Sequence, residues 1–145
     1  MNLVQVDMSG SRIVGALTDF GHDGPKHHGI IVGENTLDGK IYVAENRHTT
    51  GYELAAYDDF IERYSPKADV LVYSNDGSFS NYEVAQRALE EVIEGGKGKY
   101  NLIVNNCESF SNRAMYDSSN STQIVNTAIG LLALAGAFWV LSRAK

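Results

Sequence analysis

The chain has one cysteine, Cys107, in the segment 105–110 (NNCESF). An apolar run at 102–104 precedes this segment, and the residues from Glu108 to Met115 are predicted to form a helix. A cysteine at the start of a helix lies at the positive end of the helix dipole, which stabilises the thiolate over the thiol. We therefore interpret Cys107 as a candidate nucleophile that needs a base nearby.

The best candidate for that base lies far upstream, in the segment 27–33 (HHGIIVG). This segment is predicted to be a strand, and side chains alternate between the two faces of a strand. His27 and His28 therefore point to opposite faces and cannot both serve one site. A Cys–His site needs the imidazole within hydrogen-bond reach of the sulfur and a third polar group that orients the ring. A cysteine alone is more often an inert, buried small residue.

The elements that would position these residues follow from turn and periodicity signals. Strands are predicted at 11–18, 27–32, 41–45 and 69–73, and Asp38-Gly39 predicts a hairpin between the second and the third. Residues 52–64 have a mixed pattern, with a short helix at 58–63. The most regular helix is predicted over 81–94, because Ser80 and Glu83 form a capping box and Gly95 follows the last turn. The pattern indicates an α+β domain.

Composition excludes several classes of function. The 145 residues carry a formal net charge of −6, with no basic cluster, which argues against a nucleic-acid partner. A single cysteine cannot form an intrachain disulfide and fits a reducing compartment. The four histidines lack the spacing of a metal site, so we expect neither a metal nor a cofactor.

The C-terminal segment differs in kind from the rest of the chain. Residues 124–141 are nearly all apolar, and Arg143 and Lys145 follow them. A bilayer core takes about 20 helical residues, with roughly 17 as the lower limit. We expect a domain over 1–120 and a C-terminal hydrophobic helix over 121–145 that acts as a single-pass membrane anchor and leaves the domain on the cytoplasmic side. The alternative is a buried core helix.

Taken together, the segments 27–33 and 106–110 resemble the lecithin:retinol acyltransferase (LRAT) family, which includes small phospholipase A/acyltransferases. The family pattern is His-aromatic-Gly-Ile-aromatic-Val-Gly, followed late in the chain by Asn-Cys-Glu-His-Phe. The resemblance covers roughly residues 10–141. It implies a circularly permuted papain-like (NlpC-type) fold, with an antiparallel sheet and the cysteine on a helix N-terminus. Several small members of the family also end in a hydrophobic membrane helix.

The resemblance assigns the site residue by residue. The family histidine lies six residues before the closing glycine, so counting back from Gly33 gives His27 as the base, and Cys107 takes the position of the nucleophile. The family's third residue is usually a second histidine at the end of the next strand. Here Glu45 falls at that place, with Asn46 and His48 as alternatives. Ser109 stands where the family commonly has histidine.

The resemblance implies a membrane-anchored thiol acyl-transfer enzyme. His27 would deprotonate Cys107, and the thiolate would attack an ester or amide of a lipid or other acyl substrate to form a thioester. One alternative is a permuted cysteine peptidase or isopeptidase, because the residues from Tyr100 to Phe110 also resemble deSUMOylating-type peptidases. A second alternative is a non-catalytic, membrane-tethered interaction protein, which the absence of the usual third histidine would favour.

Overall fold

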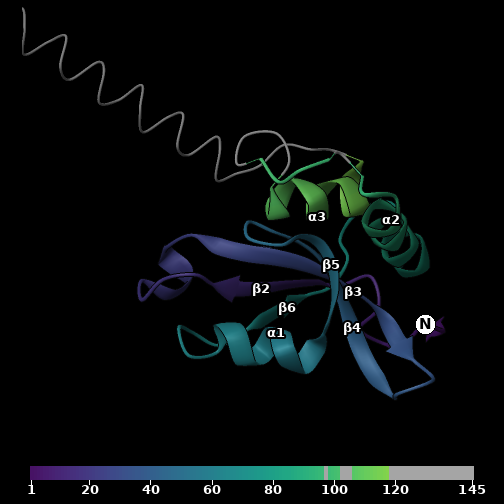
Figure 1. Cartoon of the computed structure of the whole chain (residues 1–145), viewed down its shortest axis with the longest axis horizontal. Helices are drawn as coiled ribbons and strands as arrows, with labels where there is room; N and C mark the ends of the chain where they lie inside the picture. The colour runs from purple at the N-terminus through teal and green to yellow at the C-terminus, as the bar shows by residue number, and fades with distance from the viewer. Residues whose placement is uncertain (97, 102–105, 118–145) are drawn as a thin grey trace, which may run out of the picture.

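In the computed structural model, the described residues are 1–96, 98–101 and 106–117. They form one antiparallel sheet with helices on both of its faces (Figure 1). The elements, in chain order, are β1 (Leu3–Val4), β2 (Arg12–Ala16), the 3-10 turn η1 (Gly21–Asp23), β3 (Lys26–Asn35), β4 (Lys40–Arg47), β5 (Gly51–Ala56), α1 (Tyr57–Tyr64), β6 (Leu71–Tyr73), α2 (Asn81–Glu94) and α3 (Cys107–Tyr116).

The sheet has the strand order β5-β4-β3-β2-β6, and β1 pairs with β3. All the pairings are antiparallel, and the β3–β4 hairpin closes with Asn35 opposite Lys40, as the Asp38-Gly39 turn predicts. Gly39 has φ +69°, a conformation that favours glycine. The α+β class and the antiparallel sheet are therefore confirmed, and the long central strand β3 has neighbours along both edges.

The strand β5 was not predicted, because residues 52–64 show no clear period in the sequence. The structure places β5 antiparallel to β4, with Glu45 opposite Glu53. Tyr52 and Leu54 are partly buried against the core, whereas the intervening Glu53 pairs with Arg47.

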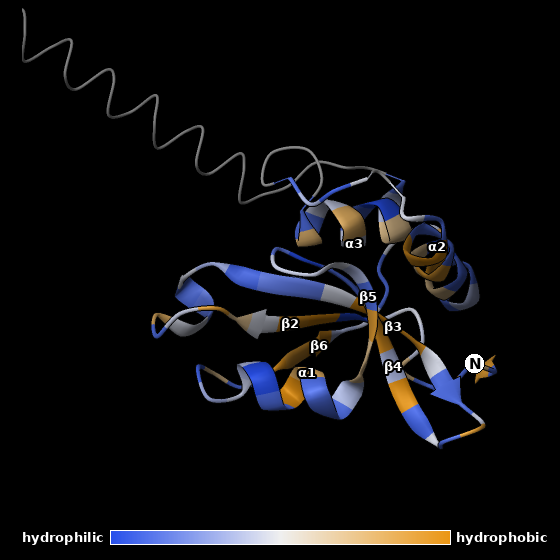
Figure 2. Cartoon of the chain, viewed as in Figure 1, coloured by the Kyte–Doolittle hydropathy of each residue, from blue (hydrophilic) through white to orange (hydrophobic). Residues whose placement is uncertain are grey.

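The core is divided between the two faces of the sheet. On one face α2 and α3 cover β3 and β4, and on the other α1 covers β2 and β4 (Figure 1). Figure 2 shows hydrophobic residues in the central strands and on α2. The buried residues of the α2–α3 face include Ile30, Val84 and Phe110, whereas those of the α1 face include Ile13 and Phe60. Each side chain on β3 therefore packs into one of these two separate parts of the core.

Both long helices begin at polar caps. The predicted capping box of α2 is present, since the Ser80 side chain accepts from the Glu83 backbone N–H and Glu83 accepts from that of Ser80. In α3 the Asn106 side chain accepts from the Ser109 backbone N–H at 2.8 Å. The helix thus begins at Cys107, one residue before the predicted start, and the cysteine occupies its first turn.

The predicted C-terminal helix over 121–145 lies outside the described residues. Within the part of the chain that the structure describes, no helix combines the length and the apolar character needed to cross a membrane.

Candidate active site

Two adjacent strands bring the predicted base and the predicted third residue together. In the β3–β4 register Gly29 lies opposite Glu45, and His27 lies two residues before Gly29 on the same face. His27 and Glu45 are therefore diagonal neighbours, and His27 Nε2 lies 2.7 Å from Glu45 Oε1. The Glu45 side chain is fully buried and that of His27 nearly so. A side chain on Gly29 would collide with Val43, which shows how closely the two strands pack here.

The carboxylate of Glu45 has a second partner, Arg63, in the last turn of α1. Arg63 Nη1 donates to Glu45 Oε1 at 3.0 Å, and Arg63 Nη2 donates to Glu45 Oε2. Arg63 Nη1 also donates to the Tyr64 hydroxyl at 3.1 Å. A buried carboxylate without such partners would be strongly destabilising. The sequence pattern did not identify Arg63 as part of the site. The one indication was its place on an amphipathic helix, three positions after the apolar Phe60.

Aromatic residues of α1 hold the imidazole of His27 in place. The Tyr64 ring is stacked on the His27 ring, with centroids 5.2 Å apart, and Phe60 lies at 5.7 Å. Gly15 is paired with His27 across β2 and β3, and a side chain there would meet the Tyr64 ring at 2.5 Å. The absence of a side chain at Gly15 therefore allows Tyr64 to approach the sheet and cover the imidazole.

Cys107 approaches the same imidazole from the N-terminus of α3. Its thiol lies close enough to His27 to help raise the pKa of that imidazole, and its Sγ donates to the Lys26 carbonyl at 3.8 Å. Because Glu45 engages Nε2 of His27, Nδ1 is the ring nitrogen available to the thiol. Cys107 is buried, with 4% of its surface exposed. The structure thus brings together Cys107, His27 and Glu45, which the sequence places in three separate segments.

The charges on His27, Glu45 and Arg63 stabilise one another. Burial alone would lower the pKa of His27, but hydrogen bonds with Cys107 and Glu45 raise it above its ordinary value of 6.5. Burial alone would raise the pKa of Glu45, but the hydrogen bonds from His27 and Arg63 hold it below its ordinary value of 4.5. Glu45 therefore remains ionised beside an imidazole that readily accepts a proton.

A cavity of about 460 Å³ opens at this end of the sheet and is lined by Cys107 and His27. Its remaining lining combines apolar and aromatic residues with polar ones: Leu17, Pro25, Tyr64 and Tyr100 beside Lys26, Arg47, His48 and Thr49. The Tyr100 hydroxyl lies beside the backbone N–H and the thiol of Cys107. Burial, followed by the charge of Cys107, raises the pKa of Tyr100 to about 12. Cys107 thus faces a cavity that small organic groups can enter.

Comparison with known proteins assigns the chain to a family. The sequence model of the family described as lecithin retinol acyltransferase (LRAT) matches residues 13–120. The protein belongs to the LRAT family. No curated protein and no solved structure matches the chain. The matched range includes all the residues of the candidate site and ends before the predicted hydrophobic helix.

The two alternatives for the third residue lie elsewhere in this LRAT-family domain. Asn46 is fully buried, but alternation along β4 places it on the face opposite Glu45. His48 lines the cavity and meets the Tyr100 ring edge-on, with centroids 5.3 Å apart. Ser109, at the position where the family commonly has histidine, is buried within α3 and its hydroxyl has no hydrogen-bond partner. Within the described residues, Glu45 is hydrogen-bonded to the His27 ring, whereas Asn46 and His48 are not.

His28 points away from the candidate site of the LRAT-family domain, as strand alternation predicts. It lines a separate cavity of about 330 Å³ beneath α3. Burial, followed by the charge of Arg12, lowers the pKa of His28 to about 3, so the ring is neutral. His22 is half-buried in η1, and its Nε2 lies 2.7 Å from the Asp69 carbonyl oxygen. Neither histidine contacts Cys107.

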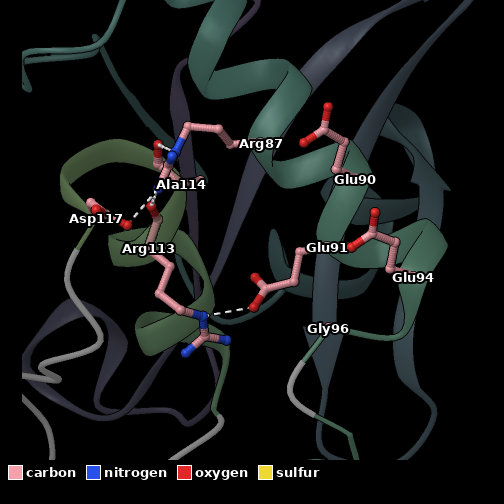
Figure 3. Close-up of a pocket in the computed structure, with 8 residues that line it drawn as sticks. All are labelled: Arg87, Glu90, Glu91, Glu94, Gly96, Arg113, Ala114 and Asp117. Atoms are coloured by element: carbon pink, nitrogen blue, oxygen red, sulfur yellow. Dashed lines mark hydrogen bonds and ion pairs between the residues drawn. The ribbon is translucent and has the colours of Figure 1, made fainter.

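A third hollow, of about 280 Å³, lies between α2 and α3 and is strongly charged (Figure 3). Arg113 pairs with Glu91 at 2.6 Å, and Arg87 pairs with Asp117 at 2.9 Å. These pairs join the two helices. No cysteine or histidine lines this hollow, so its chemistry is structural and it does not compete with the site at Cys107.

Proposed function

We propose that this LRAT-family protein is a thiol acyl-transfer enzyme of the phospholipase A/acyltransferase type, with Cys107 as the nucleophile, His27 as the base and Glu45 as the residue that orients the imidazole. The observation that supports this assignment is the position of the His27 imidazole, which lies next to the Cys107 thiol and is hydrogen-bonded to a buried, Arg63-bound carboxylate. Glu45 replaces the usual histidine, and a carboxylate can orient and stabilise an imidazolium.

The proposed reaction has two acyl-transfer steps. His27 Nδ1 takes the thiol proton, and the Cys107 thiolate adds to the carbonyl carbon of an ester. The tetrahedral intermediate collapses to a thioester, and the departing alcohol takes the proton from His27. Water or an acceptor amine or hydroxyl then adds to the thioester carbonyl and gives up a proton to His27. Collapse of this second intermediate returns the sulfur as thiolate.

The negative oxygen of each intermediate needs hydrogen-bond donors. The backbone N–H of Cys107 at the N-terminus of α3 is one donor, and the helix dipole favours negative charge at the same place. In the resting structure the Tyr100 hydroxyl lies beside this N–H. We propose that the carbonyl oxygen of the substrate accepts from this N–H and that the Tyr100 hydroxyl then donates to the same oxygen.

The surroundings of the cavity favour a lipid substrate over a peptide. The apolar and aromatic lining suits an acyl chain. Leu17, in that lining, and Phe20, in the following loop, are exposed at 46% and 79% respectively. Exposed apolar side chains beside a cavity suit contact with a membrane surface. The apolar segment 124–141 would add a permanent C-terminal anchor, with the domain on the cytoplasmic side of the bilayer.

An assay with phospholipid vesicles tests this function. The wild-type protein should release fatty acid or transfer it to an acceptor, and Cys107→Ala should reduce the rate to background. An iodoacetamide assay at pH 6–7 supplies a measurement that needs no substrate, since Cys107 should react faster than a free thiol of pKa about 8.5. Equal lipid turnover by both proteins would refute the lipid hypothesis. Cleavage of a peptide or isopeptide instead would establish the peptidase alternative.

A further inference from the structure

The cavity beneath α3 lies on the sheet face opposite the His27–Glu45 pair. It is lined by Arg12 and Val14 of β2, by Lys26 and His28 of β3, by residues at and after the end of β6, and by the C-terminal end of α3. In the β2–β3 register Val14 lies opposite His28, and Arg12 is two residues from Val14 on the same face. Arg12 and His28 are therefore diagonal neighbours at the base of one cavity.

Arg12 bears a charge that no neighbouring carboxylate neutralises directly. Its Nη2 donates to Asn112 Oδ1, a neutral amide, and its guanidinium lies 5.9 Å from the centroid of the Tyr116 ring. No acidic group forms an ion pair with Arg12 within the described part of the chain, and its buried Nε has no hydrogen-bond partner. Burying a guanidinium in this state costs free energy, and an anion bound next to it would reduce that cost.

His28 adds a second unsatisfied nitrogen to the same cavity. Its side chain is 8% exposed, and its Nδ1 is buried without a hydrogen-bond partner. The ring is neutral, so it can donate one N–H to an oxygen in the cavity. The two unsatisfied nitrogens belong to side chains held side by side on rigid central strands.

We propose that this cavity binds the phosphate group of a phosphate ester or of free phosphate, with Arg12 and His28 as the principal donors. A phosphate group presents several oxygens and accepts from donors on different sides, and the arginine fork suits it. The cationic side chains that line the cavity, Arg12 and Lys26, outnumber the single carboxylate there, Asp76. Asp76 already accepts from the Tyr116 hydroxyl, and Glu108 acts on Arg12 only at longer range.

This site is separate from the acyl-transfer site, and its occupancy does not depend on the proposed reaction. Lys26 lines both cavities, and its carbonyl accepts from the Cys107 thiol. A phosphate held by Arg12 and His28 would therefore lie close to the start of β3, next to the nucleophile. The same phosphate chemistry belongs to inorganic phosphate and to the head group of a phospholipid, so the experiment must distinguish these sources.

The experiment is a titration of the full-length protein followed by NMR of its histidine side chains at constant ionic strength. The probes are inorganic phosphate and glycerophosphocholine, with sodium chloride as the blank. We expect a saturable shift of the His28 ring signals, with little change in His22 and His48. Arg12→Met should weaken binding roughly tenfold or more, because it removes charge-assisted hydrogen bonds. Arg47→Met, which alters the other cavity, is the matched control and should bind as wild type does.

Saturation by phosphate alone would identify a free-anion site, and saturation by glycerophosphocholine would identify a head-group site; both support the proposal. A His28 response that is linear in phosphate, or equal affinity in wild type and Arg12→Met, would overturn it. Should Arg12→Met fail to fold, Arg12→Lys retains the charge and removes the Nε donor, and it should show an intermediate affinity. Thermal unfolding with and without phosphate gives a second readout, since a ligand of the native state raises the melting temperature.

Discussion

The central feature at the residue scale is the carboxylate of Glu45, which lies between a histidine and an arginine. Cys107, His27 and Glu45 could be predicted from the sequence, because strand alternation and the family pattern place each of them on a defined face or helix end. Arg63 could not be predicted, because its role depends on how α1 packs against the sheet. Arg63 offsets the buried negative charge of Glu45, so the two residues form one charged unit.

Glu45→Gln should change how stability depends on pH. The raised pKa of His27 stabilises the fold below pH 6.5, and this contribution is lost as the pH rises through the raised value. The lowered pKa of Glu45 stabilises the fold above pH 4.5, and this contribution is lost as the pH falls through the lowered value. The loss of unfolding free energy in Glu45→Gln should therefore be greatest between these limits, at about 3 kcal/mol. Urea denaturation across pH 4–9 measures it, and a loss that does not vary with pH would contradict the argument.

Arg63→Met should make the Cys107 thiol harder to ionise. Loss of the cation leaves Glu45 with excess negative charge, which disfavours a thiolate nearby and favours the imidazolium. The lower midpoint of the pH profile of iodoacetamide alkylation should rise by about one pH unit. Arg63→Lys should keep the midpoint closer to that of the wild type, because lysine retains the charge although it lacks the two-pronged contact. Arg113→Met, which breaks a similarly buried ion pair between α2 and α3, should leave the midpoint unchanged.

At the scale of elements, the site depends on the distance between α1 and β2. The strands that flank the site were predictable from their apolar alternation and from the Asp38-Gly39 turn. The strand β5 was not, because its six residues include Glu53, whose partner Arg47 lies on the neighbouring strand. The direction in which α1 crosses the sheet, and hence the contact between Tyr64 and His27, is determined by tertiary packing that no local pattern encodes.

Gly15→Ala tests this spacing. The added methyl group would meet the Tyr64 ring at 2.5 Å and push α1 away from β2. We expect a loss of about 1–3 kcal/mol in unfolding free energy, as in other overpacked cores, and a slower alkylation of Cys107 as His27 loses its aromatic cover. Gly39→Ala is the control, because its side chain meets no other group and strains only the hairpin. It should lower stability without changing the rate of alkylation. Equal alkylation rates in both variants would show that Tyr64 does not position His27.

At the scale of the whole molecule, one sheet separates two cavities of different chemistry. The face with α1 holds the ionised carboxylate and the base, and the face with α2 and α3 holds the neutral His28. The family match covers residues 13–120. We infer that the apolar C-terminal segment determines where the domain acts, whereas the residues up to 120 determine what it does.

A truncation after residue 120 tests whether the C-terminal segment controls membrane binding and the preceding residues control the reactivity of Cys107. The shortened protein should keep the alkylation rate of Cys107 within about twofold, because Lys26, His27 and Tyr100, which lie around the thiol in the described part of the chain, all precede the deletion. Sedimentation with phospholipid vesicles should fall to the level that the exposed Leu17 and Phe20 alone support. Replacing Leu17 and Phe20 with serine in the full-length chain is the matched control and should leave most of the binding intact. Vesicle binding that survives the truncation unchanged would refute the anchor.

The hydrogen bond between Cys107 and the Lys26 carbonyl joins residues that are 81 positions apart in the chain. Contacts of this sequence separation form only after a large loop has closed, and they are typical of slow steps in folding. The strands that carry the base can pair locally through short hairpins before that closure. During refolding, the sheet would therefore form before α3 docks against it, and Cys107 would stay unreactive until α3 docks. The time at which Cys107 becomes reactive would therefore measure the docking of α3.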